Sequence, residues 1–87
     1  MDDEEITRRF KRTSDAIAMI KDRQARVDLG KMFRAANGVL TEMSREAVEC
    51  RRNKKITVRY KELQHNLETT LTNLEHHITF AALIGWP

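Results

Sequence analysis

The sequence predicts an all-α protein, an antiparallel three-helix bundle that forms one domain over residues 1–87. Helix formers such as Ala, Leu, Lys, Arg, Glu and Met dominate the chain, and only one Pro and three Gly interrupt them. Apolar residues recur at the spacing of one helix face in three separate segments. We expect helices at residues 3–24, 28–51 and 56–83, in an up-down-up order that buries the three faces together.

The first predicted helix has an acidic start. Residues 2–5 are all Asp or Glu, and negative charge there complements the free amides and the dipole of a first helical turn. Ile6 and Phe10 continue the apolar stripe, which favours this early start over a later cap at Ser14 and Asp15. The stripe consists of Ile6, Phe10, Ala16, Ile17 and Ile20, with Thr13 and Gln24 as polar members.

The second predicted helix is out of phase with the first. Continuing the first stripe would bury Lys31 and Arg34, so the apolar phase slips by about two residues between Ile20 and Leu29. Such a slip turns the buried face to the other side of a helix, and we therefore expect a break within residues 22–30. The second stripe consists of Leu29, Met32, Phe33, Ala36, Leu40, Met43, Ala47 and Cys50.

Two places could provide this break. Asp28 and Gly30 lie inside the expected region, and the Asn-Gly pair at residues 37–38 is a rival because it is a strong turn signal. A glycine within a helix costs only about 1 kcal/mol, so packing could carry the helix through either place. If the first two helices were continuous, the chain would be a long helical hairpin, and we would expect it to dimerise into a four-helix bundle.

The third predicted helix follows a polar connector at residues 51–55. Its stripe advances from Ile56 to Ile78 in six steps, about 3.67 residues per turn. This spacing predicts a straight helix in a compact bundle rather than a long left-handed coiled coil. The stripe consists of Ile56, Tyr60, Leu63, Leu67, Leu71, Leu74, Ile78 and Ala81 or Ala82.

Several features favour an intracellular, cytoplasmic protein. The acidic N-terminus is unlike a signal peptide, and the longest apolar run, at residues 80–84, is too short to span a membrane. The single Cys50 cannot form an internal disulfide. Because residues 85–87, Gly-Trp-Pro, make an unusual terminus, we leave open that the chain is a piece of a longer protein.

Positive charge is confined to the first two thirds of the chain. All 16 Lys and Arg residues occur at or before Lys61, although the net charge is only +3. We expect the cluster Arg8, Arg9, Lys11 and Arg12 to meet a second cluster at one end of the bundle. Phosphate contacts there would make nucleic-acid binding the alternative function, and residues 51–55 are also typical of a nuclear import signal. The residues of this alternative site are Arg51, Arg52, Lys54, Lys55, Arg59 and Lys61.

The end of the chain is apolar. Residues 80–87 contain more large apolar side chains than a helix end needs, so they either fold back as a plug or form a docking patch for a protein. The main hypothesis is a non-enzymatic adaptor or assembly module that binds a protein partner or itself through this surface. Its candidate residues are Leu71, Leu74, Ile78, Phe80, Leu83 and Trp86.

The sequence contains no recognisable catalytic or cofactor motif. His76 and His77 point about 100° apart on a helix, and His65 lies some three turns away, so we expect no metal site. Cys50 has no paired His at a recognisable position, which argues against nucleophilic catalysis. We therefore expect neither an enzyme nor a bound cofactor.

Overall fold

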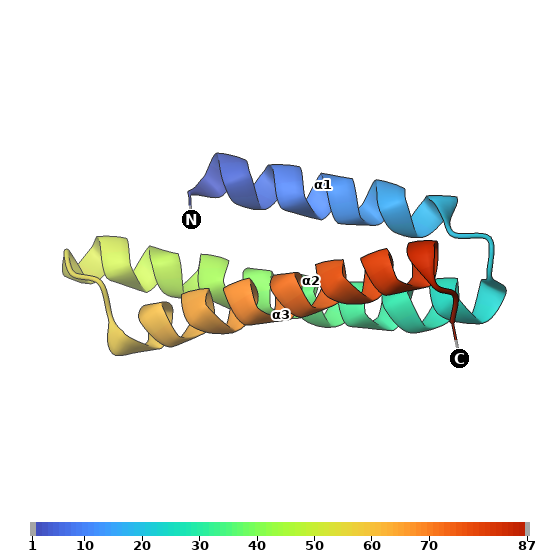
Figure 1. Ribbon diagram of the computed structural model, residues 1–87. Helices are drawn as coiled ribbons and strands as arrows, with labels where there is room; N and C mark the ends of the chain where they lie inside the picture. Colours follow the sequence, from blue (N-terminus) through green and yellow to red (C-terminus); the bar gives the residue numbers. More distant parts are fainter. Residues whose placement is uncertain (1, 87) are drawn as a thin grey trace.

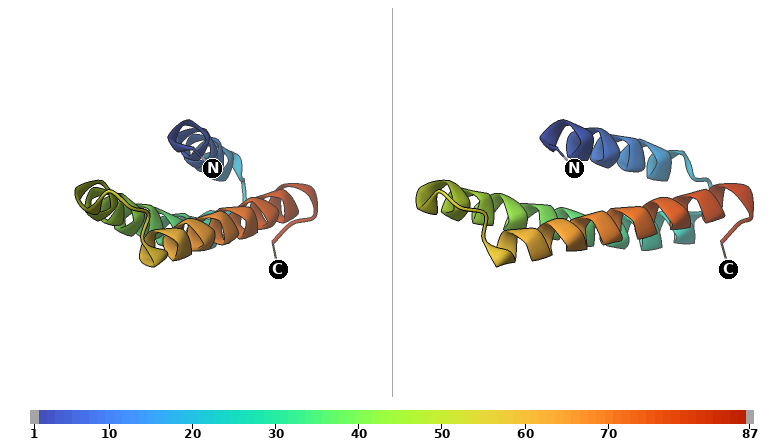
Figure 2. Two further views of the ribbon diagram at one scale, coloured as in Figure 1. Left: turned by 90° about the vertical axis from the view of Figure 1, so that its left-hand side faces the viewer. Right: turned by 60° about the vertical axis from the view of Figure 1, so that its left-hand side comes forward.

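The structure, a computed structural model, describes residues 2–86. It contains α1 (Asp3–Met19), α2 (Arg23–Asn53) and α3 (Val58–Leu83). α2 and α3 lie side by side in opposite directions, and α1 lies across one face of this pair (Figures 1 and 2). The predicted antiparallel three-helix bundle is thereby confirmed. The alternative hairpin, with the first two helices fused, is not what the chain forms.

Each helix begins at a side-chain cap. Asp2 accepts a hydrogen bond from the Glu5 amide at 2.8 Å, Asp22 from the Ala25 amide at 2.9 Å, and Thr57 from the Tyr60 amide at 3.1 Å. These bonds satisfy amides that have no partner within the first helical turn. The early start of the first helix is therefore correct, and the later alternative at Ser14 and Asp15 is wrong because both residues lie inside α1.

The break between α1 and α2 occurs earlier than the sequence predicted. α1 ends at Met19 and α2 begins at Arg23, whereas Asp28 and Gly30 lie inside α2. The Asn-Gly pair at residues 37–38 is helical as well. The cap at Asp22 sets the start of α2, and a glycine surrounded by helix formers is not sufficient to end a helix.

Arg26 holds the connector between α1 and α2 in place. Its Nη1 atom donates to the carbonyl oxygens of Ile20 at 2.7 Å and Lys21 at 3.1 Å. These carbonyls follow the last turn of α1 and have no helical donor of their own. A side chain of α2 therefore fixes the chain reversal that precedes α2.

The connector between α2 and α3 is shorter than predicted and begins later. α2 continues through Asn53 and ends at Lys54, whose φ of 55° is left-handed. Ile56 was expected to begin the third apolar stripe, but it lies outside α3 and its side chain is 63% exposed. This expectation was wrong because Thr57, as the cap of α3, excludes Ile56 from the helix.

The apolar stripes form two buried clusters along the bundle, and Phe33 packs against both of them. Leu67, Leu71 and Leu74 of α3 are completely buried, and Phe10 of α1 meets Phe33 of α2 edge-on, with ring centroids 5.6 Å apart. The predicted α2 stripe is correct, since all of its members are buried or half-buried. The buried apolar residues are Ile6, Phe10, Ile20, Ala25, Leu29, Ala36, Met43, Leu63, Leu67, Leu71, Leu74 and Ile78.

α1 is too short to cover the whole α2–α3 pair. It has 17 residues, against 31 in α2 and 26 in α3, and the molecule extends 47 Å along its longest axis. The end formed by the α2–α3 connector therefore projects beyond the start of α1 (Figure 1). None of the helices in residues 2–86 has an apolar stretch long enough to cross a bilayer.

Candidate functional site

The chain turns back after α3 and brings Trp86 onto α2. Gly85 has a φ of +113°, a conformation that side chains rarely adopt, and it provides this turn. The indole Nε1 of Trp86 donates to Asp28 Oδ2 at 2.9 Å, and its ring packs against the core around Leu29. The Trp86 ring also lies 6.2 Å from that of His77. Trp86 is thus a half-buried latch between the chain end and α2.

Three large apolar side chains next to this latch remain in solvent. Phe80 is 45% exposed, Leu83 80% and Ile84 74%, and we call these three residues the C-terminal patch. They project from the side of the last helical turns opposite buried Ile78. The end of α3 is therefore apolar both toward the core and toward solvent.

Two hollows extend the C-terminal patch. One, of about 440 Å³, lies between His76, His77, Phe80 and Trp86. The other, of about 310 Å³, adjoins it and is formed by His76 and Thr79 together with the patch itself. The patch therefore has hollows along its edge and aromatic rings on one side, and its apolar residues are contiguous.

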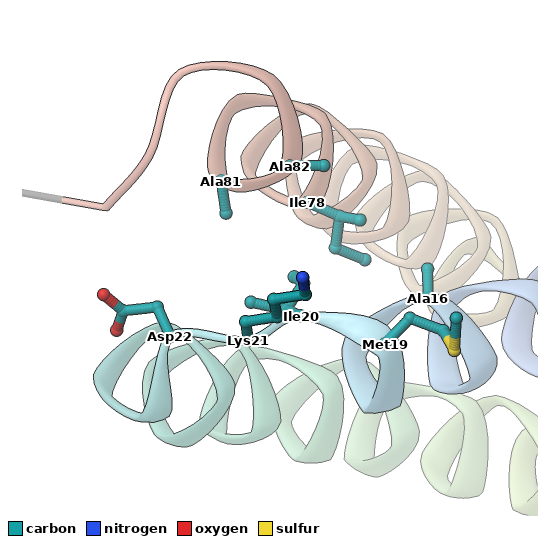
Figure 3. Close-up of a pocket in the computed structure, with 8 residues that line it drawn as sticks. All are labelled: Ala16, Met19, Ile20, Lys21, Asp22, Ile78, Ala81 and Ala82. Atoms are coloured by element: carbon teal, nitrogen blue, oxygen red, sulfur yellow. The ribbon is translucent and has the colours of Figure 1, made fainter.

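A larger groove lies on the α1 side of the same end. It has a volume of about 630 Å³ and separates the last turn of α1 and the connector from the last turns of α3 (Figure 3). Met19 borders the groove and is 81% exposed, because α1 ends at this residue and leaves no helix to cover it. The groove is lined by Ala16, Met19, Ile20, Lys21, Asp22, Ile78, Ala81 and Ala82.

The structure divides the predicted partner-binding residues into two groups. Leu71, Leu74 and Ile78 pack inside the bundle and are not exposed to a partner in this fold. Phe80 and Leu83 are exposed, whereas Trp86 is turned onto α2. The predicted plug and the predicted patch are therefore formed by different residues of one segment, of which Pro87 lies outside the described residues.

The predicted basic cluster of α1 is divided as well. Arg9 is buried and contacts two carboxylates of α3: Nη1 lies 3.1 Å from Glu68 Oε1, and Nη2 lies 2.6 Å from Glu75 Oε1. Arg9 also donates to the Thr72 hydroxyl at 3.4 Å. Arg9 is therefore a structural residue of the α1–α3 interface and is not available to phosphates.

The two carboxylates stabilise the charged form of Arg9. The hydrogen bond that Arg9 donates to Glu75, and then the one that it donates to Glu68, raise the pKa of Arg9 above its ordinary value, and burial acts in the opposite direction. Because the folded-state pKa is raised, this contribution to stability is complete at neutral pH and is lost only at strongly alkaline pH. The ion pairs therefore persist throughout the physiological range.

The two basic clusters do not meet as predicted. Asp3 at the start of α1 lines a hollow with Arg51 and Tyr60. Arg9, also in α1, instead contacts Glu68 and Glu75, which lie further along α3 than Tyr60. The short α1 is set back from the α2–α3 connector, which is why the clusters separate (Figure 1).

The histidines and Cys50 do not gather into a site. Within residues 2–86, no group of three His, Cys, Asp or Glu side chains is placed to hold a metal ion. His77 Nδ1 lies 2.8 Å from the Asn73 carbonyl oxygen, a contact within one helix. Cys50 is half-buried, and its sulfur lies 3.6 Å from the Thr57 hydroxyl, where it packs beneath the connector.

Comparison with protein-family models, with curated proteins and with solved structures found no significant match.

Sequence reasoning missed Ile84 as an exposed residue and Arg9 as a buried one. The signal for Arg9 was its position, because it follows Ile6 by three residues and therefore lies on the apolar face of α1. Glu68 and Glu75 gave a matching signal, since a seven-residue spacing places both on one face of α3.

Proposed function

We propose that this chain is a non-enzymatic interaction module that binds an apolar segment of another polypeptide through the C-terminal patch. The observation that carries the proposal is the exposure of Phe80, Leu83 and Ile84 side by side on the solvent face of α3. A bundle gains nothing from exposing such residues, and clustered apolar side chains beside an aromatic wall are typical of protein-binding sites.

The surroundings of the patch support this proposal. The open hollow beside Phe80, with a volume of about 440 Å³, adds to the surface that a partner can contact, and the hydrogen bond from Trp86 to Asp28 fixes one wall of it. Prior fixation of a binding surface lowers the entropic cost of association. A partner helix placed over the patch would bury these residues without disturbing the core.

Site-specific photo-crosslinking in cells that express the protein tests the proposal. A photoreactive phenylalanine at Leu83 is expected to give a discrete protein adduct, and the Ile84→Glu exchange is expected to abolish it. The matched control position is Val48, which is 48% exposed on α2 near the opposite end and should give no such adduct. Circular dichroism of each variant confirms that the bundle is intact.

The mass of the adduct distinguishes the partners. An adduct of twice the mass of the chain, with a sedimentation mass that rises with concentration, indicates self-association. A heavier or lighter adduct indicates a different protein. Equal labelling from Leu83 and Val48, or no labelling from either, would refute binding through the C-terminal patch.

A further inference from the structure

The α2–α3 connector forms an end of the molecule that α1 does not cover. Arg51 shares a hollow with Asp3 at the start of α1, and the connector between α2 and α3 extends beyond the start of α1 (Figure 1). The connector is well fixed, because the Thr57 hydroxyl donates to Glu46 at 2.9 Å and lies beside Cys50. This end is therefore a fixed protrusion and presents its side chains in a defined arrangement.

Positive charge is concentrated on this protrusion. Residues 45–62 comprise the connector, the last turns of α2 and the first turn of α3. They contain seven basic and three acidic side chains, a net charge of +4, whereas the whole chain carries only +3. Arg52 pairs with Glu49 at 3.4 Å and Arg59 with Glu42 at 2.9 Å. Within residues 2–86, Arg51, Lys54, Lys55 and Lys61 form no ion pair. These four cations are exposed and available to an anionic partner.

Two apolar side chains protrude among these cations. Ile56 is 63% exposed and Val58 is 73% exposed, and both lie outside the core clusters. Lys54 and Lys55 precede these two residues in the chain and Arg59 follows them, so the exposed apolar side chains are flanked by positive charge in the sequence. A surface that combines cations with projecting aliphatic side chains needs a partner that offers both anionic groups and an apolar layer.

An anionic membrane surface has this combination. Lipid phosphates and carboxylates attract Lys and Arg, and the boundary between headgroups and acyl chains accepts aliphatic side chains. Nucleic acid fits less well, because single-stranded bases are usually bound by exposed aromatic side chains, and Tyr60, the aromatic residue within residues 45–62, is half-buried against the core. The observations therefore favour a lipid surface over a nucleic acid.

We infer that the α2–α3 protrusion docks on anionic membrane surfaces, with Lys54, Lys55 and Arg51 at the headgroups and with Ile56 and Val58 inserted at the acyl boundary. The long axis then stands away from the bilayer and leaves the C-terminal patch, at the far end of a 47 Å molecule, directed toward the aqueous phase. One end would hold the membrane while the other holds a polypeptide. This inference does not depend on the proposed function of the patch.

Vesicle flotation with the purified full chain tests the inference. Binding is expected to vesicles in which about one third of the lipids are phosphatidylserine, and not to pure phosphatidylcholine vesicles. Because each Lys adds roughly fivefold to membrane affinity, the Lys54→Glu/Lys55→Glu variant should bind at least tenfold more weakly. Its control is Lys21→Glu/Arg23→Glu, which makes the same change of net charge at the opposite end and should bind normally.

A second pair of variants tests the apolar contribution. Ile56→Ser/Val58→Ser removes only exposed side chains, so the fold should be unaffected, but binding should fall roughly tenfold. The matched control, Leu83→Ser/Ile84→Ser, removes exposed apolar residues from the far end and should not change vesicle binding. The indole of an Ile56→Trp variant should shift its emission to the blue on binding, whereas the native Trp86 signal should not change.

Several outcomes would overturn the inference. Equal binding to neutral vesicles, or equal loss in the far-end controls, would exclude docking by the protrusion. If the chain instead bound an RNA or DNA oligonucleotide, with loss in Lys54→Glu/Lys55→Glu and no effect of Ile56→Ser/Val58→Ser, the protrusion would be a nucleic-acid site. Photo-crosslinking at Leu83 is also measured in the variants at residues 54–58. An unchanged adduct at Leu83 shows that protein binding by the C-terminal patch is intact when vesicle binding is lost.

Discussion

The Arg9 Nη2 atom lies 2.6 Å from Glu75 Oε1, across the interface between α1 and α3. Glu68 contributes a second contact to the same guanidinium, so Arg9 is held by carboxylates two helical turns apart. Since no Lys or Arg follows Lys61, the cation for these α3 carboxylates comes from a different helix. This arrangement fixes the position of α1 along the α2–α3 pair.

Removing Arg9 should destabilise the bundle. Arg9→Ala leaves two carboxylates facing each other without their cation and loses the packing of a buried side chain. Because both carboxylates are partly exposed, we expect a loss of about 2 kcal/mol in the free energy of unfolding rather than the larger cost of a fully buried pair. Urea denaturation measures it. Arg8→Ala, an exchange at an exposed neighbour, should change stability by less than about 0.5 kcal/mol, and equal effects would show that the ion pairs are unimportant.

Two members of the same predicted stripe should respond differently to truncation. Leu71→Ala removes a completely buried side chain and should cost about 3 kcal/mol, because it leaves a cavity in the core. Ile56→Ala lies on the exposed connector and should cost less than about 0.5 kcal/mol. Thermal unfolding followed by circular dichroism gives both values. A large loss for Ile56→Ala would mean that the third helix begins before Thr57.

The glycines of α2 offer stabilising exchanges. A Cβ added at Gly30 or Gly38 meets no atom within 4 Å, and both residues are helical. Gly30→Ala and Gly38→Ala should each raise the free energy of unfolding by about 0.5–1 kcal/mol. Gly85→Ala should instead destabilise the chain end, because its φ of +113° is strained for alanine. If Gly38→Ala were destabilising, the chain would turn at residues 37–38 after all.

The Trp86–Asp28 hydrogen bond should couple the chain end to α2. In a double-mutant cycle with Trp86→Phe and Asp28→Ala, we expect a coupling free energy of about 1 kcal/mol. Strictly additive effects would show that the bond contributes nothing. As Trp86 is the single tryptophan, its emission reports the latch directly. Asp28→Ala should therefore increase quenching of Trp86 by acrylamide, whereas Asp15→Ala, at an exposed site on α1, should not.

Local rules predicted the helices better than their ends. The stripe through Leu29, Ala36 and Met43 was visible because the buried residues of a helix repeat with its own period. The ends were misplaced because several residues can end a helix equally well in isolation. The break lies at residues 20–22, before the Asp22 cap, and not at Asp28 or Gly30. A break at this place lets Ile20 and Ala25 both reach the core.

Periodicity and composition along short segments were enough to predict three amphipathic helices, their antiparallel order and an apolar chain end. The burial of Arg9, the contact of Trp86 with Asp28 beside an exposed Leu83, and the projection of the α2–α3 connector beyond α1 became visible only in the folded chain. These properties depend on how helices of unequal length are offset, and offset is fixed by contacts between residues far apart in the chain. A charge or an apolar side chain therefore acquires its role from the neighbours that folding brings to it.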